Sequence, residues 1–428
     1  MNLLAIAAAS LLVADALRRL GSATIGTAVG AATAVNPILG EIGGTALSEA
    51  PYIFFTSVAL WATVSTRSGR TRPRLALATV FALLALLTRS IGLSVIAAVV
   101  VAVLRRARIG TILATIALST AVVAWWFWYT TSVGSTTIGH TYATDLAHAP
   151  QHIGEAIHHA AVSAKDYFFR IPAYQLGVPD IPGTNLDTQL LAAGLAVLLV
   201  AGFLALIGIW PEAATMLLGS TAILLVWPWP VMRLMNPLIP WTLAAVCLGT
   251  ADIAARLGAK NPRRFVVALS IVIAGLGVMN AATRAIRTAG CRSAGPYTDE
   301  ACFYRTERDF VRAADFVRDS VPSSAVIYTT KPSVVYVLTG RQGLPLQSLD
   351  ADEFERFLNG GRGSHVIISA LAADDYRAAF RVIEARCHEV TAPKVLSRAL
   401  VLTPRIPTSR DPDACPALMR FSSAVDSE

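Results

Sequence analysis

The sequence predicts a membrane protein of about ten transmembrane helices that is followed by a small α/β soluble domain. Two observations support this fold class. Of the 428 residues, 54% are hydrophobic and 15% are charged, whereas a soluble domain carries about 25% charged residues. Residues 1–287 consist of long apolar runs between short basic clusters, and residues 288–428 have the composition of a soluble domain. We therefore expect a transmembrane domain over 1–287 and a separate domain over 288–428.

A helix that crosses a bilayer needs about 20 mostly apolar residues. Runs of about this kind cover residues 2–17, 22–40, 48–65, 75–90, 91–104, 110–130, 189–209, 213–230, 233–254 and 265–285. The block 75–104 has basic clusters at both ends. A single helix there would put positive charge on both sides of the membrane, so we interpret the block as a hairpin that turns near Arg89.

The loops between the runs differ in charge. One set carries Arg18 and Arg19; Arg67, Arg70, Arg72 and Arg74; Arg105, Arg106 and Arg108; and Arg256, Lys260, Arg263 and Arg264. The short loops of the opposite set carry little beyond Arg89 and Arg233. Because basic loops stay in the cytoplasm, the long 131–188 loop and the C-terminal domain are expected outside it. The net charge of +8 then reflects topology, and no nucleic-acid partner is expected.

The C-terminal residues alternate between short strand and helix patterns, which predicts a mostly parallel sheet covered by helices. Strands are expected near 325–330, 343–347, 364–370 and 388–404, and helices near 306–319, 332–339, 351–359 and 373–386. Four of the five cysteines lie in this domain, and an even count outside the cytoplasm favours disulfides. Proximity in sequence suggests Cys291–Cys302 and Cys387–Cys415. Free thiols in a cytoplasmic domain are the alternative.

Polar residues at membrane depth are costly and are therefore candidates for function. Glu49 directly precedes an apolar run, where it could orient a substrate or simply favour the positive end of a helix dipole. Arg89 lies at the hairpin turn, where it could bind an anion or extend to the membrane surface. Arg233 and Asn236 lie in a proline-broken aromatic segment, and Arg233 could hold a phosphate together with Arg89.

His152, Glu155 and His159 share one helical face in the 131–188 loop. Such a trio could bind a divalent metal such as zinc. The alternative is the polar face of an amphipathic helix on the membrane surface, and we favour this alternative.

Four segments, in this order, resemble bacterial C-type glycosyltransferases related to protein O-mannosyltransferases and aminoarabinose transferases. They are NPILGEIGGTALSEAPYIFFTSVALW, ALLALLTRSIGLSVIAAVVVAVL, WPWPVMRLMNPLIPWTLAAV and KPSVVYVLTGRQGLPL. The second resembles the family's arginine-containing hairpin, and the third its late Arg-Tyr-Leu-x-Pro-x-x-Pro span, with Leu234 in place of the aromatic residue.

The resemblance implies transfer of a sugar from a polyprenyl-phosphate donor to a glycan, lipid or protein acceptor. Transfer would take place on the extracytoplasmic face of a bacterial inner membrane. Arg89, Arg233 and Asn236 would bind the donor phosphate, because arginine at the ends of spans suits phosphate oxygens.

The chain departs from the family at its start. The family's catalytic aspartate lies in the first outer loop, whereas the first aspartate here is Asp15, at the inner end of the first run. We expect that the first helix and first outer loop are missing, which leaves the catalytic base unknown and Glu49 a weak candidate. The alternative function is a non-catalytic protein that binds a lipid-linked sugar, and a transporter is a third reading.

Overall fold

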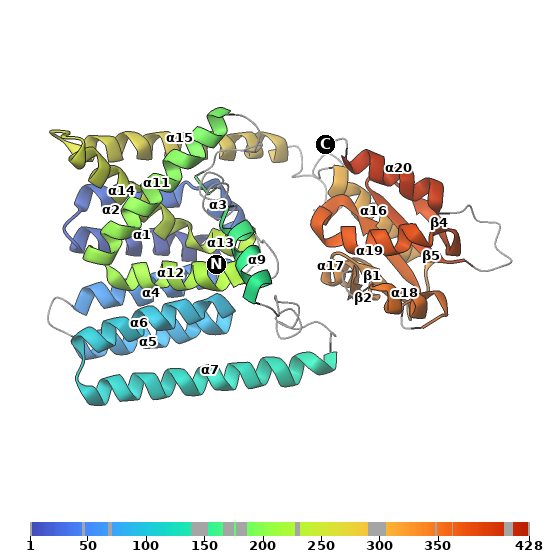
Figure 1. Cartoon of the computed structure of the whole chain (residues 1–428), viewed down its shortest axis with the longest axis horizontal. Helices are drawn as coiled ribbons and strands as arrows, with labels where there is room; N and C mark the ends of the chain where they lie inside the picture. The colour runs from blue at the N-terminus through green and yellow to red at the C-terminus, as the bar shows by residue number, and fades with distance from the viewer. Residues whose placement is uncertain are drawn as a thin grey trace. The chain divides into compact units, whose positions relative to one another are not determined.

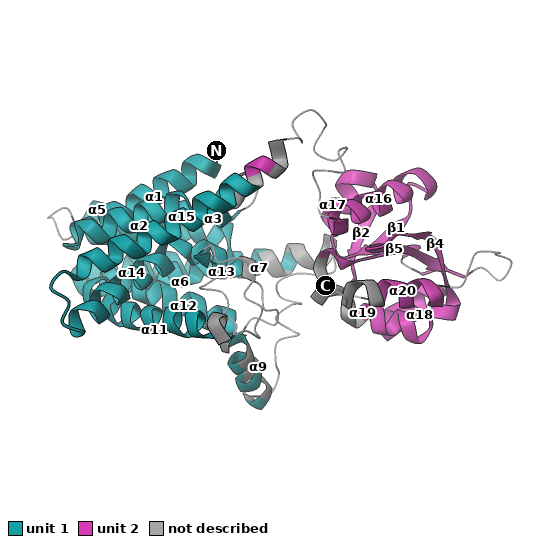
Figure 2. Cartoon of the chain, turned by 90° about the horizontal axis from the view of Figure 1, so that it is seen from above, with its two compact units in different colours: residues 1–284 teal, residues 285–428 magenta. Residues whose placement is uncertain are grey.

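The computed structural model describes residues 2–44, 48–66, 71–137, 153–165, 175–176, 186–226, 232–289, 305–346, 349–361, 363–405 and 414–426. They form two compact units, Met1–Arg284 and Ala285–Glu428 (Figure 2). The boundary falls inside helix α15 (Pro262–Ala289).

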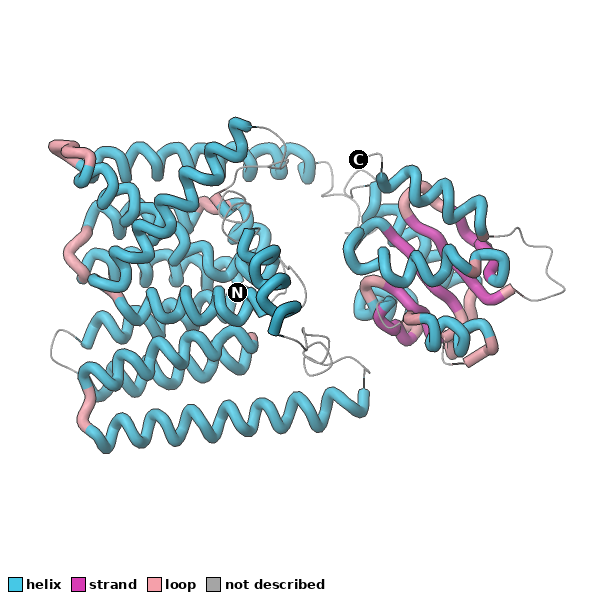
Figure 3. The backbone as a smooth tube through the Cα atoms, viewed as in Figure 1, coloured by secondary structure: helices cyan, strands magenta, loops and turns pink. Residues whose placement is uncertain are grey.

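In the described part of the first unit, all regular structure is helical (Figures 1 and 3). In chain order the helices before the long loop are α1 (Asn2–Arg19), α2 (Ala23–Ala34), α3 (Pro37–Gly44), α4 (Glu49–Ser65), α5 (Thr71–Thr88), the short 3-10 helix η2 (Ser90–Gly92), α6 (Leu93–Arg106) and α7 (Ile109–Thr137). They are followed by α9 (Ile153–Lys165), α11 (Leu186–Ile209), α12 (Pro211–Val226), α13 (Met232–Met235), the 3-10 helix η4 (Asn236–Leu238), α14 (Ile239–Arg256) and α15.

Within the described part of the chain, five helical segments are long and apolar enough to cross a membrane. They are Thr71–Thr88, Ile109–Tyr129, Gln189–Ile209, Asn236–Arg256 and Pro262–Thr283. The helices at the other expected spans are shorter or more charged. Helix α6, for example, has 14 residues and is about 21 Å long at 1.5 Å per residue, compared with about 30 Å for the hydrocarbon core. The membrane-compatible fold is thus evident, and ten spans remain a prediction.

The expectation of one helix over residues 22–40 is wrong. Helix α2 ends at Ala34, and α3 begins at Pro37. Proline has no N–H to donate, and it disfavours a helical conformation in the residue before it. The side chain of Asn36 instead caps α3, since its Oδ1 accepts hydrogen bonds from the backbone N–H groups of Ile38 and Leu39 at 3.1 and 3.2 Å.

The hairpin expected near Arg89 is present. Helices α5 and α6 pack against each other on either side of η2, and Arg89 leaves the helix with an extended backbone (φ −155°). The turn is tight because Gly92 lies against the preceding helix. A Cβ atom at this position would be 2.4 Å from the backbone nitrogen of Leu86. Only glycine permits this approach.

Helices α11 and α14 cross with their backbones in direct contact. A Cβ atom on Gly202 would lie 1.6 Å from the carbonyl oxygen of Ala245, and one on Gly249 would lie 1.9 Å from that of Leu198. Small residues that allow such close approach are a common way to pack helices in membranes.

We therefore expect Gly202→Ala to push α11 away from α14 and lower the free energy of unfolding by about 1–3 kcal/mol, as in overpacked cores. The measurement is unfolding by SDS in mixed micelles. Gly208→Ala on the same helix is the matched control, because its Cβ would meet nothing within 4 Å. Equal unfolding midpoints for the two variants would contradict this packing.

The first unit has two chemically different ends. Helix α6 runs from one end, which we call the Glu49 end, to the other, which we call the Arg106 end. At the Arg106 end, Arg106 donates to the carbonyl of Thr63 (2.7 Å) near the end of α4, and Trp61 donates to Asp15 (2.9 Å) near the end of α1. The helix termini at this end carry Arg18, Arg19, Arg72, Arg74, Arg105, Arg106, Arg108, Arg256, Arg263 and Arg264.

Fewer basic residues lie toward the Glu49 end. They include Arg89, Arg233 in α13 and Arg284 in α15. The described residues thus show a clear difference in basic content between the two ends.

The second unit contains a five-stranded sheet with strand order β2-β1-β3-β5-β4. The strands are β1 (Val326–Thr329), β2 (Gln342–Pro345), β3 (His365–Ser369), β4 (Val390–Val395) and β5 (Ala399–Pro404). Strand β1 is parallel to both β2 and β3, whereas β5 is antiparallel to β3 and β4. The sheet is therefore mixed rather than mostly parallel.

Helices cover this sheet (Figure 3). They are α16 (Arg305–Ser320), α17 (Pro332–Thr339), α18 (Ala351–Leu358), α19 (Ala373–Ala385) and α20 (Cys415–Asp426). Asp350 caps α18 by accepting a hydrogen bond from the N–H of Glu353 at 2.8 Å, which is a typical N-cap arrangement.

A disulfide joins Cys387 to Cys415 at the start of α20. This is the pairing that proximity in sequence suggested, whereas Cys291 and Cys302 lie outside the described residues. The bond closes a loop with a sequence separation of 28 residues, which restricts the unfolded chain.

Removing this bond in the double variant Cys387→Ala/Cys415→Ala should lower the stability of the second unit by about 2–4 kcal/mol. Pulse proteolysis in urea, read on fragments of the second unit, measures the change. Cys247→Ala is the control, because Cys247 is a buried free thiol of the first unit. A double variant as resistant as the control would show that the disulfide does not stabilise this unit.

Candidate functional site

A buried ion pair lies at the Glu49 end. Arg89 Nη1 is 2.6 Å from Glu49 Oε1, and the two side chains are 10% and 0% exposed. Glu49 is in the first turn of α4, where the helix dipole favours a negative charge. Arg89 reaches it because α5 ends beside the start of α4, with which it packs along its length. Two of the residues selected from the sequence are thus brought together.

Four buried hydroxyl groups lie near this ion pair, on residues of α4, α6 and α12. Tyr52 and Thr56 extend from α4, Ser94 from α6 and Ser220 from α12, and all four residues are buried. The oxygens of Ser94 and Ser220 are 2.8 Å apart, and Tyr52 lies close to Thr56, Ser94 and Ser220. The Tyr52 hydroxyl has no hydrogen-bond partner among the described residues.

Buried amides connect three distant segments at the same end. Asn36 Nδ2 donates to the backbone carbonyl of Gln175 at 2.7 Å, and Gln175 Nε2 donates to the carbonyl of Met235 at 2.7 Å. A residue of the long 131–188 segment is thereby attached to the helical unit. Asn236 is the residue after Met235 and the first residue of η4. Helix η4 packs against α4. The Oδ1 atom of Asn236 is buried, with no hydrogen-bond partner in the described part of the chain.

The remaining residues selected from the sequence are only partly described. The backbone of Arg233 belongs to α13, but its side chain lies outside the described residues. His152 also lies outside them, and the side chains of Glu155 and His159 on α9 are not described. Where side chains are described, no group of three or more metal-ligating residues occurs. The metal trio therefore stays a prediction.

Glu49 was the weak candidate for a catalytic base. In the structure its carboxylate is committed to Arg89 at 2.6 Å. A charge-assisted contact of this kind holds the guanidinium in one orientation. The geometry therefore fits a positioning role for Glu49 better than proton abstraction.

A second buried ion pair, at the Arg106 end, did not emerge from the sequence. Arg106 Nη2 is 2.6 Å from Glu212 Oε1, and the Glu212 side chain is fully buried. Glu212 follows Pro211 at the start of α12. The sequence feature that could have indicated Glu212 is a single acidic residue directly before an apolar run. Glu49 has the same feature.

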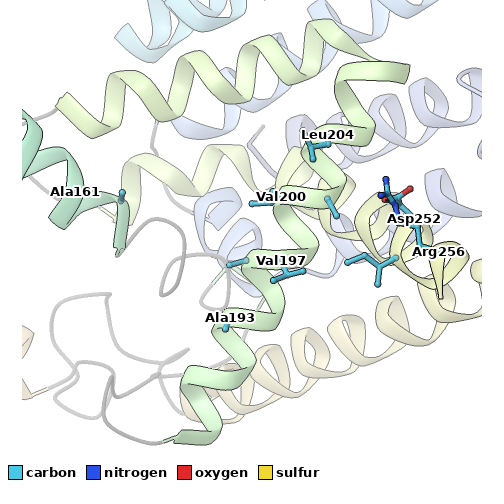
Figure 4. A pocket seen from close by; sticks show the side chains of 11 residues that line it. Ala161, Ala193, Val197, Val200, Leu204, Asp252 and Arg256 are labelled. Atoms are coloured by element: carbon cyan, nitrogen blue, oxygen red, sulfur yellow. Dashed lines mark hydrogen bonds and ion pairs between the residues drawn. The ribbon is translucent and has the colours of Figure 1, made fainter.

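Several apolar spaces lie between the described helices, and two of them adjoin α11. A groove of about 1020 Å³ runs along α11 and is lined mostly by alanine, valine and leucine, with the Asp252–Arg256 ion pair at one edge (Figure 4). A smaller cavity of about 230 Å³ lies between α11, α12 and the Met235–Thr242 segment. Met235 lines this cavity and is the residue next to Asn236. Glu49 and Arg89 line neither space.

The Glu49–Arg89 pair can be tested by substitution. Arg89→Met removes the cation and leaves the Glu49 carboxylate buried, which should cost about 3–5 kcal/mol. The double variant Glu49→Gln/Arg89→Met removes both charges and should recover most of that loss. SDS-induced unfolding measures both. If the double variant is no more stable than Arg89→Met, the two charges do not stabilise each other.

Comparison with known proteins gives no family assignment. No protein-family model matches the chain, and no curated protein matches it either.

Proposed function

We propose that this chain is a membrane protein that binds a polyprenyl-phosphate-linked sugar and transfers the sugar to an acceptor on the extracytoplasmic face of a bacterial inner membrane. The observation that carries the proposal is the buried Glu49–Arg89 ion pair, which lies beside buried amides at the end of the helical unit that has fewer basic residues. The acceptor would be a glycan, a lipid or a protein.

The distribution of charge supports the orientation. Basic residues gather at the Arg106 end, and such residues remain in the cytoplasm. The Glu49 end would then face outward. Helix α7 carries aromatic side chains toward its C-terminal end, among them the stacked pair Trp125 and Tyr129 with ring centroids 5.6 Å apart, as expected where a span meets a membrane interface. Aromatic residues of this kind concentrate at membrane interfaces.

Arg89 supplies the chemistry for a phosphate. A guanidinium carries five N–H donors, and the contact with Glu49 uses one side of the group. The remaining donors can bind phosphate oxygens, and Glu49 keeps the group in place when no phosphate is bound. In this proposal Arg233 adds a second positive charge, so that the site with both arginines and Glu49 is net positive.

The apolar cavity beside Met235, of about 230 Å³, suits the part of the donor's hydrocarbon chain that lies next to the phosphate. It lies between α11, α12 and α14 and is lined largely by leucine, valine, phenylalanine and methionine. Because Asn236 adjoins this cavity in the chain, a lipid held there would have its phosphate near the Glu49 end. The phosphate and the hydrocarbon chain of the donor would thus bind at neighbouring sites.

A second candidate function is non-catalytic binding of the same lipid-linked sugar. One observation favours it: the Glu49 carboxylate is engaged in an ion pair, which leaves it poorly placed to act as a base. Binding and transfer are separable by experiment, since a binding protein would hold the donor without turning it over.

Binding of the phosphate tests the proposal. Native mass spectrometry of the detergent-solubilised protein can measure binding of polyprenyl phosphate and of polyprenol. The two ligands differ only in the phosphate group. We expect Arg89→Ala to weaken binding of the phosphate by about tenfold or more, as expected for loss of a charge-assisted contact, and to leave polyprenol unaffected.

Arg256→Ala is the matched control. Arg256 is also paired with a carboxylate, that of Asp252, but lies at the Arg106 end. If Arg89→Ala and Arg256→Ala bind polyprenyl phosphate as the parent does, the phosphate site is not at Arg89. A labelled donor then distinguishes the two functions. An enzyme would release the sugar from the donor, and a binding protein would not.

A further inference from the structure

Helix α17 of the second unit presents an apolar face to solvent. Val334, Tyr336 and Val337 are 37%, 61% and 75% exposed. The other large hydrophobic side chains exposed among the described residues of this unit, Ile286, Val395 and Met419, lie on other elements. Exposed apolar side chains that cluster on one element indicate an interaction surface.

The opposite face of α17 is already used. Val335 and Thr339 are buried, and the helix packs against β1, β2 and α16. The exposed residues therefore do not belong to the core of the second unit. They form a separate face, defined by Val334, Tyr336 and Val337, which we call the α17 face.

The charged residues that flank α17 in the sequence are basic. Lys331 precedes the helix as its N-cap residue, and Arg341 follows its C-terminal Gly340. Arg341 is held close to the helix end because its Nη2 donates to the carbonyls of Arg318 and Val321 at 2.8 and 2.7 Å. Residues 331–346 contain no aspartate or glutamate. The face is thus apolar and aromatic with basic flanks, which is the pattern of a segment that binds an anionic membrane surface.

If the first unit spans a membrane, the linker between the units keeps the second unit near the membrane surface. Fifteen residues, 290–304, join α15 to α16, and a fully extended chain of that length spans about 50 Å. Tethering at such a distance raises the effective concentration of a surface for its partner. A small apolar face that would bind weakly in free solution can therefore remain bound.

We propose that α17 docks the second unit onto an anionic phospholipid bilayer, with Val334, Tyr336 and Val337 inserted into the interfacial layer and Lys331 facing lipid phosphates. This inference requires that the first unit lies in a membrane, and it does not depend on sugar transfer. It makes the second unit a peripheral membrane domain as well as a tethered one.

Site-specific photo-cross-linking tests the proposal in the full chain. Benzoylphenylalanine replaces Tyr336, and the protein is placed in nanodiscs that contain phosphatidylglycerol. Met419 is the matched control site, because it lies on α20 and is also 61% exposed. We expect phospholipid adducts, detected by mass spectrometry, to be about tenfold more abundant at position 336 than at position 419.

The added substitutions Val334→Glu and Val337→Glu should reduce the adduct at position 336 to the level of the control site. Pairing of Cys387 with Cys415, checked by non-reducing peptide mapping, shows that the unit is still folded. Cross-links from position 336 to another part of this chain or to a second copy would overturn the proposal in favour of a protein partner. Equal lipid adducts at positions 336 and 419 would overturn it as well.

Discussion

The contact between Glu49 and Arg89 is the constraint on which the arrangement of the first unit depends. A charged side chain removed from water is costly unless an opposite charge lies beside it. Each of these two buried charges compensates the other. Their pairing fixes the start of α4 against the end of α5 and sets the tight turn in which Gly92 lies against Leu86. The same contact orients a guanidinium at the end of the bundle that has few other basic residues.

A second buried ion pair joins helices at the Arg106 end. Arg106 and Glu212 connect α6 to α12, and Arg106 also donates to the carbonyl of Thr63 on α4. Helix α4 thus takes part in an ion pair at one end of the bundle and α6 in an ion pair at the other. Helices α6 and α12 are also joined between these ends, where the hydroxyls of Ser94 and Ser220 are in contact. Such polar contacts in an apolar bundle specify which helices are neighbours, since mispaired charges would remain uncompensated.

Much of the helical pattern could be predicted from the sequence, because hydrophobic runs and basic clusters are local signals. The hairpin at Arg89 followed from charge alone. The break at Asn36–Pro37 was missed, although the proline was a local signal for it. The two ion pairs could not be predicted as pairs, because residues 40 and 106 positions apart meet only through packing. For the same reason the antiparallel addition of β5 and β4 to the parallel strands was not foreseen.

A structure determined by electron cryomicroscopy with polyprenyl phosphate bound would test the central claim most directly. The account predicts that the phosphate contacts the Arg89 guanidinium while Glu49 remains beside it, and that the hydrocarbon chain enters the cavity next to Met235. A phosphate bound at the Arg106–Glu212 end, or bound without contact to Arg89, would contradict it.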